Sequence, residues 1–306
     1  MEMVTLGKTG LRVSRLGVGL VEIGVQLSEG ETELAGRVLN TALDGGINFL
    51  DTAECYGISE DLIGQTVSHR RSEFILATKA GHPSYGTDWP RFTGETVRRN
   101  IERSLRRLKT DYVDLLQIHA YDVFGEPPDD VVEAVLDIKR QGKTRFVGYS
   151  QENEEAIWAI ESGVFDTLQT AFHIMDQRAR YSIFEMASAA NMGIIAKRPV
   201  GNAMWGRVFR PEDHYENTVA RRLRQRAEKM RALGPIDAEP DSHIETALGF
   251  VLAHPEVHTA IVGTRNPAHM QSNIELVSGR PALAQGLVKE LHRRYDEVGA
   301  DWRSID

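Results

Sequence analysis

Short apolar runs alternate with longer segments of helical periodicity along most of the chain. Between residues 31 and 45, apolar side chains recur at helical spacing, which predicts an amphipathic helix. The apolar run at residues 47–50 follows directly and predicts a buried strand. The same pair of patterns returns toward the C-terminus, and strands are predicted at residues 15–20, 47–50, 74–79, 112–119, 144–149, 167–170, 193–196 and 259–263.

Eight predicted strands with helices between them indicate one (β/α)₈ TIM barrel, and a chain of 306 residues has the length that this fold needs. Residues 4–13 predict a β-hairpin before the barrel, and residues 283–298 predict an extra C-terminal helix. Residues 201–241 are too long for a simple connection, so they predict an insertion after the seventh strand, with a helix at about residues 217–233. We expect a single domain over residues 1–306, with the insertion near the ligand.

Composition narrows the classes of partner. The net charge of −8 and the pI of about 5.7 argue against nucleic-acid and anionic-membrane partners, which attract positively charged surfaces. No run of 18 apolar residues occurs, residues 1–25 lack the apolar core of a signal peptide, and one cysteine allows no internal disulfide. We therefore expect a cytoplasmic protein that acts on a small molecule. The pattern does not indicate an oligomeric state.

Polar side chains stand at the predicted C-terminal ends of five consecutive strands. They are Asp51, Lys79, His119, Ser150 and Gln169. Tyr56 lies on the loop just beyond Asp51. Because the C-terminal ends of barrel strands converge on one mouth, these six side chains are expected to share a cleft.

An acid, a phenol, an ammonium and an imidazole in one cleft can deliver a proton to a carbonyl oxygen. Tyrosine has a pKa of about 10, so the reverse reaction near neutral pH needs a pKa lower by about 3 units, or roughly 4 kcal/mol. An ammonium at about 4 Å supplies that much, so Lys79 is expected to lower the Tyr56 pKa while Asp51 holds Lys79. Neutral His119 would donate a hydrogen bond to the substrate oxygen. No side chain is a hydride source, so a cofactor must supply the hydride.

Two other patterns are less informative. Cys55 has no histidine that sequence logic places to activate it, so a nucleophilic role is not expected. His254 and His258 have the spacing of metal ligands, but Pro255 lies between them and no third ligand is evident, so no metal site is expected.

Glycine-rich and arginine-rich segments have simple interpretations. The glycines of residues 17–24 do not open a helix and so do not form a dinucleotide-binding turn, but Gly19 and Leu20 are expected to line a cofactor channel with their backbone. The arginine-rich residues 221–229 are expected to form the solvated face of the insertion helix.

Three strings resemble the aldo-keto reductase family: GINFLDTAECYG at residues 46–57, ATKAG at 77–81 and DLLQIH at 114–119. The resemblance continues in order from Leu6 to Trp302. It implies an NAD(P)(H)-dependent oxidoreductase of the EC 1.1.1 class, with Tyr56 as proton donor. It also implies a catalytic tetrad of Asp51, Tyr56, Lys79 and His119.

The resemblance also implies cofactor contacts at the strand ends. Ser150 and Gln169 match the positions that bind the nicotinamide carboxamide. Gln151 stands where the family usually has asparagine. In the segment that includes Lys197 and Pro199, Lys197 takes the place of an aromatic ring that often stacks on the nicotinamide.

Residues 261–273 resemble the segment that holds the adenosine phosphate, at a helix N-terminus where free N–H groups favour phosphate. The matching residues are Gly263, Thr264, Arg265, His269 and Asn273. Some relatives have lysine at the position of Gly263, and several have arginine at that of His269. Arg265 can bind a 2′-phosphate, so NADP(H) is favoured over NAD(H).

The substrate is left open by the sequence. The expected pocket wall includes Glu22, Trp89, Tyr121 and Trp205, with His82 and Tyr85 nearby, and predicts an aromatic lining. Three functions remain: an NADP(H)-dependent carbonyl reductase, an NAD-dependent sugar or alcohol dehydrogenase, and a regulatory subunit that binds nicotinamide and reports redox state, as the potassium-channel beta subunits of this family do.

Overall fold

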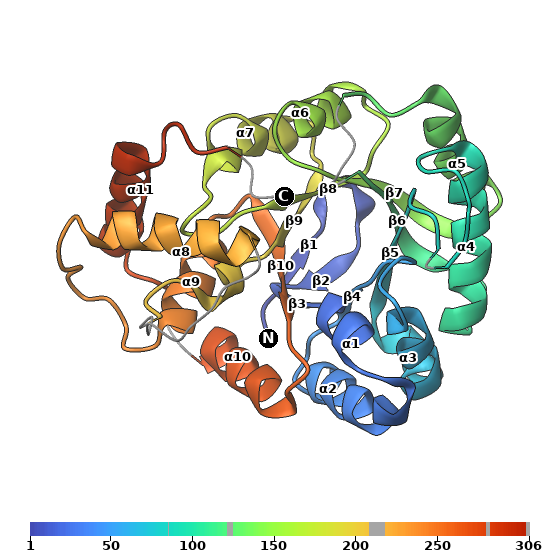
Figure 1. The fold of residues 1–306 in the computed structure, drawn as a ribbon, viewed down its shortest axis with the longest axis horizontal. Helices are drawn as coiled ribbons and strands as arrows, with labels where there is room; N and C mark the ends of the chain where they lie inside the picture. The colour runs from blue at the N-terminus through green and yellow to red at the C-terminus, as the bar shows by residue number, and fades with distance from the viewer. Residues whose placement is uncertain (85, 121–124, 208–217, 280–281, 304–306) are drawn as a thin grey trace.

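Eight parallel strands form a closed barrel in a computed structural model that describes residues 1–84, 86–120, 125–207, 218–279 and 282–303 (Figure 1). The strands are β3 (Leu16–Gly19), β4 (Phe49–Asp51), β5 (Ile75–Ala80), β6 (Val113–His119), β7 (Thr144–Ser150), β8 (Thr167–Ala171), β9 (Gly193–Lys197) and β10 (Val257–Gly263). Each strand pairs with the next along the chain, and β10 closes the barrel against β3. The predicted fold is confirmed, and every predicted strand is present with slightly different ends.

The N-terminal hairpin closes the far end of the barrel. Strands β1 (Met3–Thr5) and β2 (Arg12–Ser14) pair antiparallel, with a short 3₁₀ turn, η1 (Gly7–Thr9), between them. Leu6, Leu11 and Val13 of this segment are buried against the apolar side chains that fill the barrel interior. Gly7 has φ of 48° and its Cα lies so close to the start of β9 that a side chain would not fit. In Figure 1 the hairpin (blue) lies across the middle of the barrel.

Helices cover the outside of the barrel, as predicted. They are α2 (Thr32–Asp44), α3 (Ser59–Thr66), α4 (Gly94–Leu108), α5 (Asp129–Arg140), α6 (Asn153–Glu161), α7 (Ile183–Ala189), α9 (His243–Leu252), α10 (Pro267–Gly279) and α11 (Gln285–Val298). Thr93 caps α4 as expected, because its side chain accepts a hydrogen bond from the backbone of Thr96 at 3.3 Å. A short helix, α1 (Val21–Gln26), was not predicted, and it carries Glu22 to the rim of the barrel.

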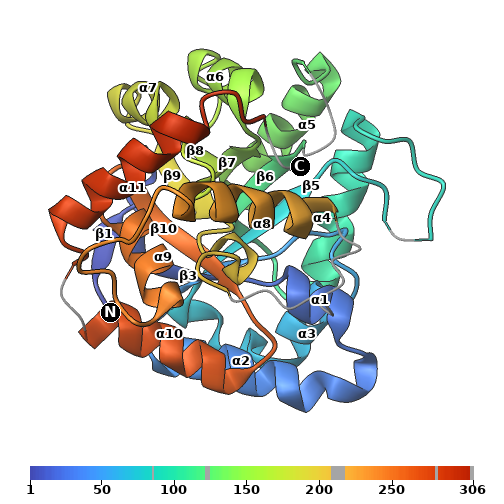
Figure 2. The same ribbon diagram turned by 60° about the vertical axis from the view of Figure 1, so that its left-hand side comes forward.

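The segment after β9 contains a 3₁₀ turn, η5 (Gly201–Ala203), and helix α8 (Thr218–Arg231). Figures 1 and 2 show α8 beside α9 and α11. The arginine-rich run is only partly solvated, which corrects the expectation. Arg226 is buried, donates to the carbonyls of Met175 and Arg303, and stacks on Trp302, so it anchors α8 to the body of the protein.

Candidate active site

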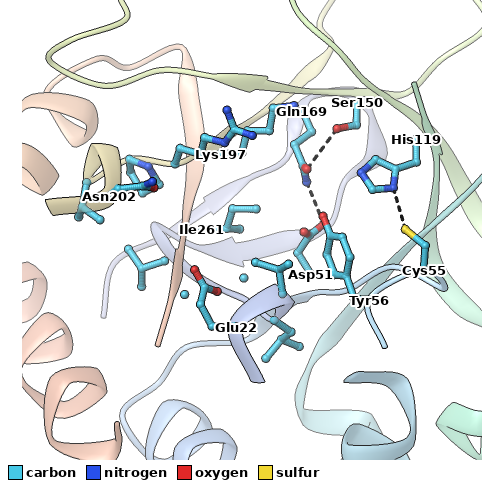
Figure 3. A pocket seen from close by; sticks show the side chains of 18 of the residues that line it. Glu22, Asp51, Cys55, Tyr56, His119, Ser150, Gln169, Lys197, Asn202 and Ile261 are labelled. Carbon is cyan, nitrogen blue, oxygen red and sulfur yellow. Dashed lines mark hydrogen bonds between the residues drawn. The ribbon is translucent and has the colours of Figure 1, made fainter. Parts of the chain in front are cut away.

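A cavity of about 530 Å³ opens at the C-terminal ends of the barrel strands (Figure 3). Its wall includes three of the four predicted catalytic residues, Asp51, Tyr56 and His119. It also includes Gly19, Leu20, Glu22, Cys55, Ser150, Gln169, Lys197, Arg198, Pro199, Asn202 and Gly263. The C-terminal ends of the strands converge on one mouth, so the predicted side chains lie together as expected.

Lys79 and Asp51 form a buried ion pair beneath the cavity. Lys79 Nζ donates to Asp51 Oδ2 at 2.5 Å and to the Thr52 carbonyl at 2.9 Å. The other carboxylate oxygen, Asp51 Oδ1, accepts from the side-chain amides of Gln117 at 2.9 Å and Gln169 at 2.8 Å. The two charges are compensated by each other and by amides, which is the condition for burying a charged pair.

Tyr56 is positioned by a tight loop that an arginine holds from behind. The loop begins with Tyr56 N–H donating to the Ala53 carbonyl at 3.1 Å. Arg107 of α4 donates to the backbone carbonyls of Glu54 and Gly57, and so clamps the loop on either side of Tyr56. The ring centroid of Tyr56 lies 4.9 Å from Lys79 Nζ and 5.6 Å from the His119 ring, edge to face.

The Tyr56 phenol differs from the expectation. Burial raises its pKa above the ordinary value of tyrosine, and the charge of Asp51 adds to this rise. The cations that oppose the rise are Lys197 and Arg198 at the end of β9, rather than Lys79. The physical reason is that Lys79 is paired to Asp51, whose carboxylate charge acts on the Tyr56 pKa in the opposite direction. With its pKa raised, Tyr56 is a protonated phenol at neutral pH.

His119 is a buried, neutral imidazole. Burial lowers its pKa well below the ordinary range, and the charges of Lys79, His82 and Lys197 act in the same direction. The His82 ring packs edge-on against it, with centroids 5.3 Å apart. The Nδ1 atom of His119 lies 3.5 Å from Cys55 Sγ. A histidine therefore does lie beside Cys55, contrary to the sequence reasoning. Burial raises the pKa of the Cys55 thiol to about 11, which leaves it protonated and a poor nucleophile.

Ser150 and Gln169 share one wall, while Gln151 does not reach the cavity. Ser150 Oγ lies 3.3 Å from Gln169 Oε1. Gln151 points away, because its amide donates to the Ala120 carbonyl at 2.6 Å and its oxygen accepts from the backbone of Glu152. This conformation argues against the expected cofactor contact of Gln151.

Lys197 is paired with a residue that sequence reasoning missed. Its Nζ lies 2.8 Å from Glu152 Oε1, and the Glu152 side chain is buried with 3% exposure. The same Glu152 oxygen accepts the backbone N–H of Ala171 at 3.2 Å. The available signal was the substitution itself, because a lysine in place of an aromatic ring inside a barrel mouth requires a nearby anion.

The rim beside β10 combines glycines with a carboxylate. Gly19 and Gly263 face each other across paired strands, and Glu22 lies so close to Gly263 that a side chain there would collide with its carboxylate. Burial raises the pKa of Glu22, and its Oε2 has no hydrogen-bond partner among the described residues. Thr264, Arg265, His269 and Asn273 lie outside the cavity, with Arg265 and His269 exposed. The positive charge of Arg265 is felt by Glu31.

Among the described residues, the tryptophans predicted to line the pocket do not line the cavity. Trp205 is buried and donates to Glu239 Oε1 at 2.7 Å, while Trp89 lies in a separate surface groove beside Arg99 of α4. Neither lines the cavity, because the loops that carry them fold outward or into the core. Tyr85 and Tyr121 lie outside the described residues.

The described ranges contain neither a metal-binding cluster nor a membrane-spanning helix. There, no group of three His, Cys, Asp or Glu side chains is arranged to hold a metal ion. His254 Nε2 lies 3.0 Å from His292 Nε2, while His258 Nδ1 accepts the backbone N–H of Ile194. Across the same residues, every helix is too short or too polar to span a bilayer.

The chain is similar to known oxidoreductases over nearly its whole length. A sequence model of the Aldo/keto reductase family matches residues 15–284. The chain is 31% identical over 324 residues to the Bacillus subtilis protein named uncharacterized oxidoreductase YrpG, covering 97% of this chain and 96% of that protein. It is 26% identical to L-galactose dehydrogenase of Arabidopsis thaliana, over 92% of this chain and 90% of that protein.

A solved structure is similar as well. The holo form of aldo-keto reductase AKR11C1 from Bacillus halodurans superposes with a TM-score of 0.79 at 27% identity, over 96% of each chain. The family match, the closed barrel and the cluster of side chains at its mouth agree. The chain therefore belongs to the aldo/keto reductase family of oxidoreductases.

Proposed function

We propose that this protein reduces aldehydes or ketones to alcohols, reversibly, with NADP(H) as cofactor and Tyr56 as proton donor. The observation that carries the proposal is that Tyr56, neutral His119 and the Lys79–Asp51 pair meet at one cavity. The protonated phenol has the form needed to give a proton to a developing alkoxide. His119 supplies a second hydrogen bond to the same oxygen. The Lys79–Asp51 ion pair lies beneath these two residues.

The cavity suits a nicotinamide nucleotide. Ser150 and Gln169 present a hydroxyl and an amide side by side, which matches the donor and acceptor of a carboxamide. Gly19 leaves the backbone of β3 open to a ligand, while the Glu22 carboxylate lies against Gly263 of β10. Such a cofactor would supply the hydride in reduction and, in its oxidised form, a positive charge that favours the ionised phenol.

The preference for NADP(H) rests on Arg265. It is exposed at the N-terminus of α10, where backbone N–H groups without helical partners favour a phosphate. A guanidinium binds phosphate oxygens in pairs, so Arg265 is suited to a 2′-phosphate. Thr264 and Asn273 stand on the same segment.

A second candidate is an NAD-dependent sugar or alcohol dehydrogenase, and Glu22 favours it. Its half-buried side chain lines the cavity, and its buried Oε2 suits hydroxyl donors, either of a sugar or of an unphosphorylated ribose. The lack of tryptophan in the described wall also fits a polar substrate better than an aromatic one. The relative named L-galactose dehydrogenase is in keeping with this alternative.

One assay separates these functions. The protein is offered aromatic, aliphatic and sugar-derived carbonyls with NADPH or NADH, and the loss of reduced-nicotinamide absorbance is followed. Faster turnover with NADPH is expected. Turnover confined to sugars with NAD⁺ would favour the second candidate. Tight nicotinamide binding without turnover of any carbonyl or alcohol would instead indicate a regulatory subunit.

A further inference from the structure

Cys55 and His119 form a contact for which the proposed reaction has no role so far. Cys55 is the single cysteine of the chain and directly precedes Tyr56. Its Sγ lies 3.5 Å from His119 Nδ1, within hydrogen-bond distance for sulfur. Figure 3 shows this nitrogen turned toward Cys55 and the other ring nitrogen turned toward the cavity.

The protonation states of the two groups decide how they interact. A neutral imidazole has one N–H and one bare nitrogen, and the partner at one nitrogen decides which of the two carries the proton. His119 is buried beside the cationic Lys79, which keeps it neutral. Cys55 is a protonated thiol, so its S–H is available to donate. Bare imidazole nitrogen is a good acceptor, whereas thiol sulfur is a weak one.

We propose that Cys55 is a positioning residue whose S–H donates to His119 Nδ1 and thereby fixes the imidazole proton on Nε2. His119 then presents Nε2–H to the cavity, which is the form that donates to a carbonyl oxygen. This inference rests on the proposed carbonyl chemistry for its consequence, but the hydrogen bond itself does not depend on any substrate.

The geometry around the pair supports a directed role. The Arg107 clamp fixes the loop that carries both Cys55 and Tyr56, so one loop positions the phenol and the thiol together. The edge-on packing of His82 restrains the plane of the His119 ring. Because the ring plane is restrained and the loop is fixed, the Cys55 thiol stays beside His119 Nδ1. The contact is therefore not lost through rotation of the His119 ring.

Infrared spectroscopy of the S–H stretch tests the hydrogen bond directly, because a chain with one cysteine has one such band. In the protein without substrate or cofactor, the band is expected below the frequency of a free thiol. His119→Leu should move it toward the free-thiol position, while His69→Leu, a control at an exposed histidine outside the cavity wall, should leave it shifted. A wild-type band at the free-thiol frequency would overturn the proposal, and so would a band that His119→Leu does not move.

Nitrogen-15 NMR of the His119 ring and kinetics test the consequence. Wild type and Cys55→Ser are expected to carry the proton on Nε2, whereas Cys55→Ala should give a mixture of tautomers. The kcat for carbonyl reduction should fall about 10-fold in Cys55→Ala, less than loss of a whole donor would cost, and should recover in Cys55→Ser. Cofactor Kd should be the same in all three. An unchanged tautomer in Cys55→Ala would refute the inference, while absence of turnover in wild type would refute only the proposed function.

Discussion

Two walls of the cavity differ in what holds their residues in place. The reaction wall consists of Asp51, Tyr56 and His119, with Lys79 beneath it. Asp51, Lys79 and His119 are buried, Tyr56 is half-buried, and neighbours from β4 to β8 hold the Asp51–Lys79 pair. The nucleotide wall consists of Arg198, Pro199, Asn202 and Gly263, and it follows β9 and β10. There the backbone does much of the lining, Asn202 is exposed, and Arg198 and Asn202 have φ of 56° and 54°.

The difference indicates how each wall is used. Left-handed backbone at residues other than glycine costs about 1 kcal/mol or more and tends to gather at ligand-binding segments. Protein contacts hold the side chains of the reaction wall, whereas the nucleotide wall contains left-handed backbone at Arg198 and Asn202, which a bound ligand would help to stabilise. Changes to the first should alter turnover, and changes to the second should alter affinity.

The largest effect is expected from Tyr56→Phe. Removing the phenol removes the proposed proton donor, so turnover should fall by about 10³-fold or more. NADPH affinity, measured by fluorescence titration, should stay close to that of wild type because the phenol acts on substrate. Turnover at the wild-type rate would rule Tyr56 out as the donor and with it the division between the walls.

The next effect concerns Lys197, which stands beside the nucleotide wall. Like the charged residues of the reaction site, it has a buried ion-pair partner, Glu152. Lys197→Met leaves the buried Glu152 carboxylate without its cation, so the free energy of unfolding should fall by about 3 kcal/mol in urea titrations. The double variant Lys197→Met with Glu152→Gln is the control and should recover most of that loss. Equal losses in the single and double variants would show that the pair is not energetically coupled.

A smaller effect, on affinity alone, is expected from Arg265→Ala. Loss of a charge-assisted contact to a 2′-phosphate should weaken NADPH binding by about 10- to 100-fold in calorimetry and leave NADH nearly unchanged. Arg293→Ala, on the exposed face of α11, serves as a matched surface control. Equal weakening of both cofactors would mean that Arg265 does not read the 2′-phosphate.

An effect on the pH dependence of stability is expected behind the reaction wall, at Glu60 of α3. Burial raises the pKa of Glu60 from 4.5 to about 7. Between these values the unfolded chain loses this proton while the folded chain keeps it, so the contribution of Glu60 to stability falls as pH rises, by at most about 1.4 kcal/mol per pH unit. Below the lower value and above the upper value it is flat.

Glu60→Gln isolates this contribution from those of other groups. Buried histidines such as His173, whose pKa is lowered to about 4, give the opposite slope in both proteins and cancel in the difference. The difference in unfolding free energy between wild type and Glu60→Gln should therefore change between pH 5 and pH 7. A difference that stays constant over this range would contradict a raised pKa at Glu60.

The arrangement of the reaction wall could be predicted from sequence because it follows from strand ends alone. Asp51 and His119 end buried strands and Lys79 stands one residue before the end of β5, and parallel strands in a barrel bring their ends to one mouth. Their interaction energies could not be predicted in the same way. Lys79 was expected to lower the Tyr56 pKa, but its partner Asp51 carries a charge that raises it, and burial of the phenol raises it further.

The parts that sequence could not predict depend on loops and on contacts between distant segments. The pairing of Lys197 with Glu152 joins the ends of two different strands, and the fit of Glu22 against Gly263 requires the short helix α1. Trp89 and Trp205 were assigned to the pocket because they are aromatic and lie on loops. Composition does not say which way a loop turns, and both point elsewhere.

The hairpin of β1 and β2 covers the N-terminal end of the barrel strands. Because Leu6, Leu11 and Val13 close that end, substrate and cofactor have to exchange through the opposite mouth. A substrate and a cofactor that bind in this cavity would share one exit, so the departure of one would depend on whether the other is still bound. Product-inhibition patterns would measure that dependence.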